Sequence, residues 1–160
     1  MIRNLLIASV LIAPSAALAQ TLPTAPYLPL EMAEKAAKAA LQACVAKGSA
    51  VTVAIVTRDG ATKTVLKADN SGPHTVSSAT GKAFAAASLG RDSGEIADFI
   101  ASKPANDGLR NMDERMVIQA GGLPVKIGEA LVGGIGVGGA PSGAIDVECA
   151  RQGLNAIGAK

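Results

Sequence analysis

Aromatic side chains are nearly absent from this 160-residue chain, which has no tryptophan, one tyrosine and two phenylalanines. A hydrophobic core must therefore be built from Ala, Val, Ile and Leu, whose small side chains favour close contacts between helices and sheet. No charge predominates either, since 15 basic and 13 acidic residues are interspersed and leave a net charge of +2. Without a basic stripe or exposed rings on which bases could stack, no nucleic acid is expected as a partner.

Histidine and cysteine are also scarce, with one His and two Cys in the whole chain. The cysteines lack CxxC spacing, which argues against zinc and thiol-exchange motifs. No nucleophile accompanies the single His, so we predict no catalytic residues. The acidic residues form no recognisable general acid/base pair, and the last two are expected to serve the first turn of a final helix: Asp59, Asp69, Asp92, Glu95, Asp98, Asp113, Asp146 and Glu148.

Long hydrophobic runs are missing except for Leu5 to Ala13, which is shorter than the roughly 20 residues that a membrane span needs. Arg3 precedes this run and the small residues of Ala17-Leu18-Ala19 follow it. The pattern predicts a secretory signal peptide over residues 1–19, and a periplasmic or secreted protein with no membrane insertion after cleavage. A structural N-terminal helix or a membrane anchor is the alternative. Residues 20–29 are expected to form a Pro-rich linker to a single domain over residues 30–160.

Hydrophobic periodicity predicts an α+β domain in the order α-ββ-αα-βββ-α. We expect helices over residues 31–47, 76–89, 92–103 and 142–157, the last capped by Ser142. Strands are expected over residues 50–57, 62–66, 115–120, 123–127 and 130–137. Because short connections join successive strands, the five should form a mainly antiparallel sheet.

Both cysteines lie on the apolar face of a predicted helix, Cys44 in the first and Cys149 in the last. An exported chain folds in a compartment that permits oxidation. If the two helices pack side by side on the sheet, a Cys44–Cys149 disulfide follows. Two buried free thiols are the alternative.

A glycine-rich run extends over residues 133–139. It is not a phosphate-binding loop, because it lies within a predicted strand, leads into Ala140-Pro141 and lacks Gly-Lys-Ser/Thr. We interpret the glycines as places where another strand, a second subunit or a flat ligand comes close to the backbone. Tight subunit packing would make the protein a homo-oligomer.

Four short motifs occur in order along the chain: Lys82-Ala83-Phe84, residues 121–125, residues 134–140 and residues 146–150. Together they cover nearly all of residues 30–157, and the chain resembles the GlcG/HbpS haem-degrading-domain family. The resemblance implies a profilin-like fold, symmetric oligomers and haem as the cofactor, and in exported members a role in haem sensing or breakdown. Cobalamin-pathway relatives also bind haem. Ala85 and Gly138 replace a Thr and a Ser that are common in the family, so two hydroxyls are missing.

The resemblance directs attention to His74, in the turn Gly72-Pro73-His74-Thr75, as the haem iron ligand. A solvent-exposed loop His is the alternative.

Thr75 is a candidate oxygen ligand or the cap of the following helix, whose first amides and Lys82 could receive the propionates. Arg91, at the other end of that helix, is a further candidate. A solvated face is the alternative for Lys82 and Arg91. Met112 and Met116 are candidate axial sulfurs or core residues.

These observations predict an exported haem-binding protein that serves haem sensing, storage or slow degradation, with at most weak turnover in which the iron does the chemistry. The alternative is a structural or accessory oligomer that binds a partner protein or a small organic acid and no haem. A flavin or corrinoid is a third possible ligand.

Overall fold

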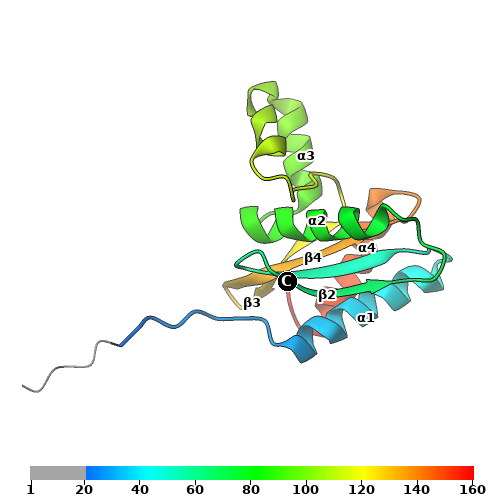
Figure 1. Ribbon diagram of the computed structural model, residues 1–160, viewed down its shortest axis with the longest axis horizontal. Coiled ribbons are helices and arrows are strands. Elements are labelled where there is room, and N and C mark those ends of the chain that lie inside the picture. The colour runs from blue at the N-terminus through cyan, green and yellow to red at the C-terminus, as the bar shows by residue number, and fades with distance from the viewer. Residues whose placement is uncertain (1–20) are drawn as a thin grey trace, which may run out of the picture.

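The computed structural model describes residues 21–160, so the predicted signal peptide lies outside the described residues. One antiparallel sheet of four strands, in the order β2-β1-β4-β3, forms the middle layer. Helix α2 covers one face of this sheet, and α1 and α4 lie on the other (Figure 1). The elements are α1 (Leu30–Ala46), β1 (Thr52–Thr57), β2 (Thr62–Lys67), α2 (Thr75–Leu89), α3 (Ser93–Ser102), the 3-10 helix η1 (Pro104–Asn111), β3 (Gly122–Ile127), β4 (Ala130–Gly138) and α4 (Gly143–Ala156).

The first and last helices pack side by side, as predicted. The buried positions of α1 recur at helical spacing and place Cys44 on the face that meets α4. Cys44 and Cys149 form a disulfide, with their Cα atoms 5.5 Å apart, so the prediction of this bond is confirmed. Helix α4 starts where expected, because the Ser142 hydroxyl accepts a hydrogen bond from the Ile145 amide.

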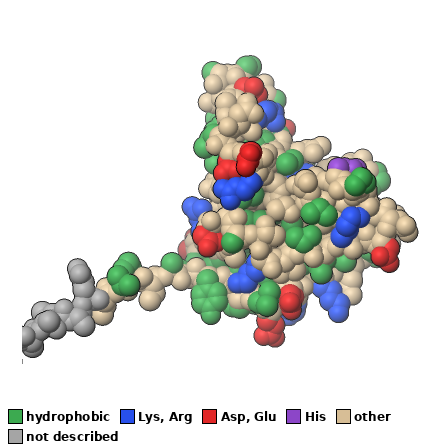
Figure 2. All heavy atoms as spheres, in the orientation of Figure 1, with side chains coloured by type: hydrophobic (Ala, Val, Ile, Leu, Met, Phe, Trp, Pro, Cys, Tyr) green, Lys and Arg blue, Asp and Glu red, His purple; other side chains and the backbone are tan. Residues whose placement is uncertain are grey.

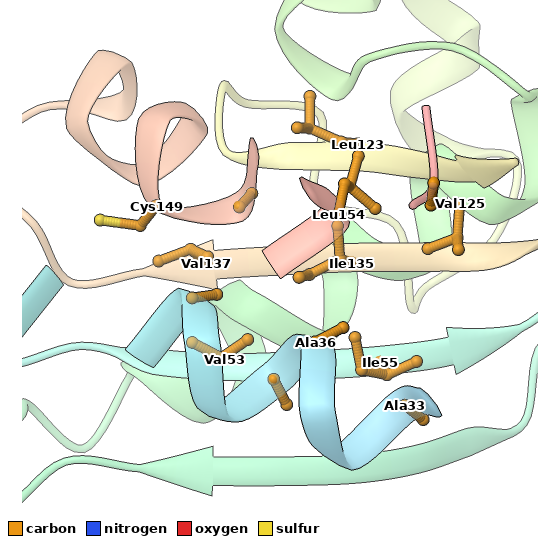
Figure 3. Packing of buried hydrophobic residues seen from close by; sticks show 14 of the residues in the cluster. Ala33, Ala36, Val53, Ile55, Leu123, Val125, Ile135, Val137, Cys149 and Leu154 are labelled. Atoms are coloured by element: carbon orange, nitrogen blue, oxygen red, sulfur yellow. The ribbon is translucent and has the colours of Figure 1, made fainter. Parts of the chain in front are cut away.

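The sheet is built around β1, which pairs with β2 on one side and β4 on the other. Asp59-Gly60 forms the predicted turn of the β1–β2 hairpin, with Gly60 at φ +86°. Side chains of β1 and β4 meet opposite partners in register, for example Val53 with Val137 and Ile55 with Ile135. Together with α1 and α4 they form the larger core cluster (Figure 3), which contains no aromatic side chain.

The glycines of β4 serve a contact that the sequence interpretation did not include. A Cβ atom on Gly134 would lie 2.2 Å from the Ala83 carbonyl oxygen, and one on Gly136 would lie 2.0 Å from that of Ala79. Both carbonyls belong to helix α2, which therefore rests directly on the strand backbone. Only Gly133 faces a neighbouring strand, at the Val56 carbonyl. The β4 glycines thus give no evidence for subunit packing, and the homo-oligomer stays a prediction.

The α+β class is confirmed, but the predicted count of five strands is wrong. Residues 115–120 form no strand. This segment crosses α2 instead, where the Val117 amide donates to the Gly81 carbonyl and its side chain fills the space that a Cβ on Gly81 would need. The apolar run Met116-Val117-Ile118 had the composition of a strand, yet Ile118 packs into a small cluster with α3.

Helix α3 and η1 form a lobe that projects from the sheet and α2 (Figure 1). Ile96 and Ile100 attach this lobe to Ala85 of α2. Within residues 21–160, no helix combines the length and the apolarity that a membrane span requires.

Candidate functional site

Of the four predicted site residues, only His74 and Thr75 lie together, at the start of helix α2, whereas Lys82 lies within the helix and Arg91 beyond its end. His74 directly precedes the helix, and Arg91 follows its left-handed cap residue Gly90. At about 1.5 Å per residue, the 15-residue helix holds these two residues more than ~20 Å apart.

His74 lies on the surface at the start of α2, where its side chain is exposed (Figure 2). The imidazole rests against Gly72: a Cβ there would lie 2.7 Å from Cε1 and 3.0 Å from Nδ1. Nε2 is further from that position, at 3.7 Å. No hydrogen bond joins the ring to any residue between 21 and 160, so the imidazole is available to a ligand. Gly72 makes room for this ring position.

Two backbone amides beside His74 have no partner among the described residues. The Thr75 amide donates to Gly72, and the Ser78 amide donates to the His74 carbonyl. The amides of Val76 and Ser77 lie between them, and no side chain caps this helix end. Free amides at a helix start attract carboxylates, because their partial positive charges add to that of the helix dipole.

Thr75 is buried and belongs to the support of this helix start. Its hydroxyl donates to the Gly72 carbonyl at 2.7 Å. It therefore accepts from the Thr52 hydroxyl, also at 2.7 Å. The Thr75 side chain ties the turn to strand β1 and does not cap the helix.

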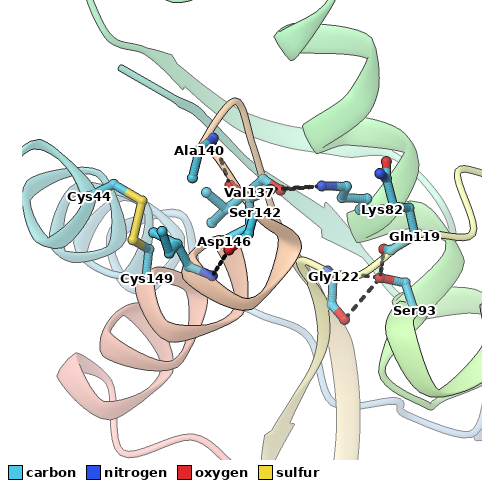
Figure 4. A network of polar contacts seen from close by, with 11 residues as sticks. Cys44, Lys82, Ser93, Gln119, Gly122, Val137, Ala140, Ser142, Asp146 and Cys149 are labelled. Carbon is cyan, nitrogen blue, oxygen red and sulfur yellow. Dashed lines mark hydrogen bonds and ion pairs between the residues drawn. A yellow bond between two sulfur atoms is a disulfide. The ribbon is translucent and has the colours of Figure 1, made fainter. Parts of the chain in front are cut away.

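Lys82 is buried on α2, so the alternative of a solvated face is wrong for this residue. Its ammonium group donates to Asp146 Oδ2 at 2.9 Å and to the Val137 carbonyl at 3.1 Å (Figure 4). The side chains of Lys82 and Asp146 are only 3% and 4% exposed. Asp146 also accepts from the Ala140 amide at 3.1 Å. This pair joins α2, β4 and α4 at the centre of the molecule.

Burial raises the pKa of Asp146 above its usual value, and the hydrogen bond and charge of Lys82 partly offset this effect. Sequence reasoning placed Asp146 in the first helical turn and missed its partner. A signal was present: Asp146 shares a helical face with Cys149, Ala150 and Gly153, which are buried. A carboxylate on a buried face needs a cation or hydrogen-bond donors as partners, which makes a buried Lys a candidate.

Arg91 is exposed, and its Nε lies 3.9 Å from Glu95 Oε2. Its guanidinium carbon lies 5.5 Å from the centroid of the Phe99 ring. Its contacts are therefore with helix α3. Met116 packs in the core, as its alternative reading held, whereas Met112 is exposed.

Ala85 and Gly138, which stand where the family often has hydroxyl side chains, both lie in close contact with neighbouring residues. Ala85 is enclosed by the isoleucines of the α3 lobe. A Cβ on Gly138 would lie 2.8 Å from the Ser78 hydroxyl oxygen. In the part of the chain that the structure describes, His, Cys, Asp and Glu side chains nowhere gather in groups of three or more able to hold a metal ion.

Comparison with known proteins identifies relatives of this architecture. A family model described as haem-degrading protein HbpS-like matches residues 28–155. The crystal structure of a double mutant of Streptomyces reticuli HbpS is 41% identical, with a TM-score of 0.80, over 90% of this chain and 96% of that one. No curated protein sequence matches significantly.

Two further structures share the fold. The Klebsiella pneumoniae protein ORFY is 25% identical, with a TM-score of 0.80, over 89% of this chain and 98% of its own. A PduOC:haem complex is 20% identical, with a TM-score of 0.77, over 84% and 98% of the two chains. The family match covers most of the residues described, and the identity to HbpS extends over both chains almost completely. The protein therefore belongs to the HbpS-like haem-degrading protein family.

Proposed function

We propose that this protein binds haem at the start of helix α2, with His74 as the iron ligand. The observation that carries the proposal is the exposed imidazole, free of hydrogen bonds within residues 21–160, directly beside the unpaired amides of Val76 and Ser77. An imidazole nitrogen suits haem iron, and amides at a helix start suit a propionate. Family membership and the haem complex of the structural neighbour PduOC add support.

The residues at this helix start fit the two chemical demands of haem, a nitrogen donor for iron and donors for carboxylate. Lys82 does not fit as a propionate partner, because its ammonium group is committed to Asp146 and Val137. Arg91 lies at the opposite end of the helix. Thr75 holds the turn that carries His74, as a positioning residue. Bound haem supplies iron-centred redox chemistry, while the chain holds and orients it.

We further propose that the protein works outside the cytoplasm, in haem sensing, storage or slow breakdown. The Cys44–Cys149 disulfide supports an oxidising compartment, and the N-terminal sequence has the pattern of a secretory signal. Recovery of the protein from the periplasm or medium, with Gln20 as its first residue, tests this part.

The haem proposal is tested by titrating the purified protein with haemin and following the Soret band. The wild type should bind saturably, and His74→Ala should shift the band and weaken binding. Gly72→Ala should alter the spectrum while the fold persists, since the added methyl displaces the imidazole and Gly72 has no left-handed backbone to strain. Arg91→Ala is the matched control and should bind as the wild type does.

Two results would refute the proposal. A wild type that gives no saturable Soret change does not bind haem, which would favour the accessory oligomer. A His74→Ala variant with the spectrum and affinity of the wild type would remove His74 as the ligand. Circular dichroism of each variant separates loss of the ligand from loss of the fold.

A further inference from the structure

A hollow of about 530 Å³ lies between the end of helix α1 and the end of strand β2. These two ends lie at the same end of the molecule as the start of α2 (Figure 1). Sites that hold small molecules commonly have volumes of about 300–1,000 Å³. Gly48, just after α1, lines the hollow, and a Cβ there would meet nothing within 4 Å. The hollow therefore has the size of a small-molecule site, and its Gly48 side is open to a ligand.

One wall of the hollow is aliphatic. Leu41 and Val45 line it, and their spacing of four residues places them on the same face of α1. Leu41 is half-buried, whereas Val45 is 54% exposed. A short aliphatic group of a ligand would remove this apolar surface from water, which is favourable.

Ser49 also lines the hollow and is buried, at 7% exposed. Its hydroxyl forms no hydrogen bond with any residue between 21 and 160, although buried hydroxyls are normally paired. The other six buried polar or charged residues all have side-chain hydrogen bonds: Thr52, Ser71, Thr75, Lys82, Ser93 and Asp146. Ser49 therefore keeps a hydroxyl available to a ligand in the hollow.

Two side chains of opposite charge line the hollow without ionic partners. The Lys67 ammonium donates to the Ser71 carbonyl and, at 2.6 Å, to the Ser71 hydroxyl. Within residues 21–160, no acid lies at ion-pair distance from Lys67, and no base lies at that distance from the exposed Asp69. The hollow thus offers a cation to a carboxylate and a carboxylate to an ammonium group.

We propose that this hollow binds a small aliphatic α-amino acid. Lys67 and Ser49 receive its carboxylate, and Asp69 receives its ammonium group. Leu41 and Val45 contact its side chain. A simple carboxylic acid would bring a second negative charge to Asp69, and a simple amine would bring a second positive charge to Lys67, and like charges at close range repel. None of these five residues belongs to the proposed haem site, so either proposal can fail without the other.

The test is isothermal titration calorimetry of the purified protein with L-leucine, which should bind saturably at one site. Three probes each lack one recognised group: glycine lacks the side chain, 4-methylpentanoate the ammonium group and 3-methylbutylamine the carboxylate. Each should bind roughly 10- to 100-fold more weakly, as expected for loss of a buried aliphatic group or of a hydrogen bond to a charged group. In NMR spectra, leucine should shift the amide signals of Val45 and Ala68, which line the hollow.

Variants assign the contacts. Asp69→Asn should weaken leucine binding by the same factor, and Ser49→Ala should weaken it less. Asp98→Asn is the matched control, because it makes the same change at an exposed acid of α3 that has no ionic partner in residues 21–160, and it should bind leucine as the wild type does. Lys67 is left unchanged because it also holds Ser71. Circular dichroism checks that each variant is folded.

Four results would each overturn the proposal. They are a wild type that does not bind leucine, 4-methylpentanoate or 3-methylbutylamine that binds as tightly as leucine, an unchanged affinity in Asp69→Asn, and equal weakening in Asp98→Asn. The haemin titration bears on the haem site alone, so its outcome is separate from all four.

Discussion

The buried pair of Lys82 and Asp146 gives the sharpest test of how this fold is held together. Replacing Lys82 by Met leaves the Asp146 carboxyl buried with the Ala140 amide as its remaining protein donor. Removal of one member of a buried ion pair costs about 3–5 kcal/mol, since an uncompensated charge remains. Small domains have about 5–15 kcal/mol of stability in total, so Lys82→Met should lower the midpoint of urea unfolding severely.

A double-mutant cycle separates the pair from the individual side chains. Asp146→Asn keeps the volume and an acceptor for the Ala140 amide, but leaves the Lys82 charge without its partner. The double variant, Lys82→Met with Asp146→Asn, should lose at least about 2 kcal/mol less than the two single losses added together. Unfolding is followed by circular dichroism with the disulfide intact. Agreement between the van't Hoff enthalpy and the enthalpy measured by calorimetry checks two-state behaviour.

The dependence on pH has a definite sign. Burial holds the pKa of Asp146 above the unfolded value of 3.8, and loss of Lys82 removes the partner that lowers this pKa. The contribution of such a group is fully present below pH 3.8 and is lost as the pH rises through the folded pKa. The deficit of Lys82→Met relative to the wild type should therefore be larger at pH 7 than at acidic pH.

An exposed pair provides the control. Lys47 and Glu148 are also joined at 2.7 Å, but their side chains are half exposed. Lys47→Met should change the free energy of unfolding by less than about 1 kcal/mol. If Lys82→Met cost no more than this, or if the two single losses simply added, the account of the buried pair would be refuted.

Three further predictions concern the disulfide, the strand glycines and one surface acid. Replacing both Cys44 and Cys149 by Ala should lower the free energy of unfolding by about 4–5 kcal/mol in urea titrations, because the bond closes a loop of roughly 100 residues. Gly136→Ala should cost at least about 2 kcal/mol, since its Cβ would meet the backbone of α2 at 2.0 Å. The Asp113 carboxyl should titrate at about 2 by NMR, because hydrogen bonds from Arg115 lower its pKa.

Each of these has its own check. A wild type whose stability is unchanged by reductant would contradict the disulfide estimate. Gly108→Ala has open space around its Cβ and should stay within about 0.5 kcal/mol of the wild type. Arg115→Ala should return the Asp113 pKa toward 3.8, and an unmoved titration would show that another group lowers it.

Local patterns predicted most of the elements and one long-range bond. Helical spacing in residues 31–47 and 142–157 put Cys44 and Cys149 on buried faces, and two helices on one side of a sheet have few ways to arrange those faces. The prediction of a strand over residues 115–120 was wrong because a short apolar run is compatible with a strand or with an irregular segment packed on a helix. Pairing partners decide between these, and residues 115–120 pair with no strand of the sheet, because the Val117 amide donates to the Gly81 carbonyl of α2 instead.

The candidate site, too, was predicted partly from the sequence and decided partly by the tertiary structure. The sequence by itself determined the family, and it predicted His74, Thr75, Lys82 and Arg91 as the residues that serve haem. Only the tertiary structure decided that Lys82 forms an ion pair with Asp146 and that α2 packs on the backbone of the β4 glycines. It also decided that His74 and Arg91 lie at opposite ends of one helix. The physical reason is that charge and backbone contacts depend on which faces meet, whereas periodicity along the chain specifies only the faces themselves.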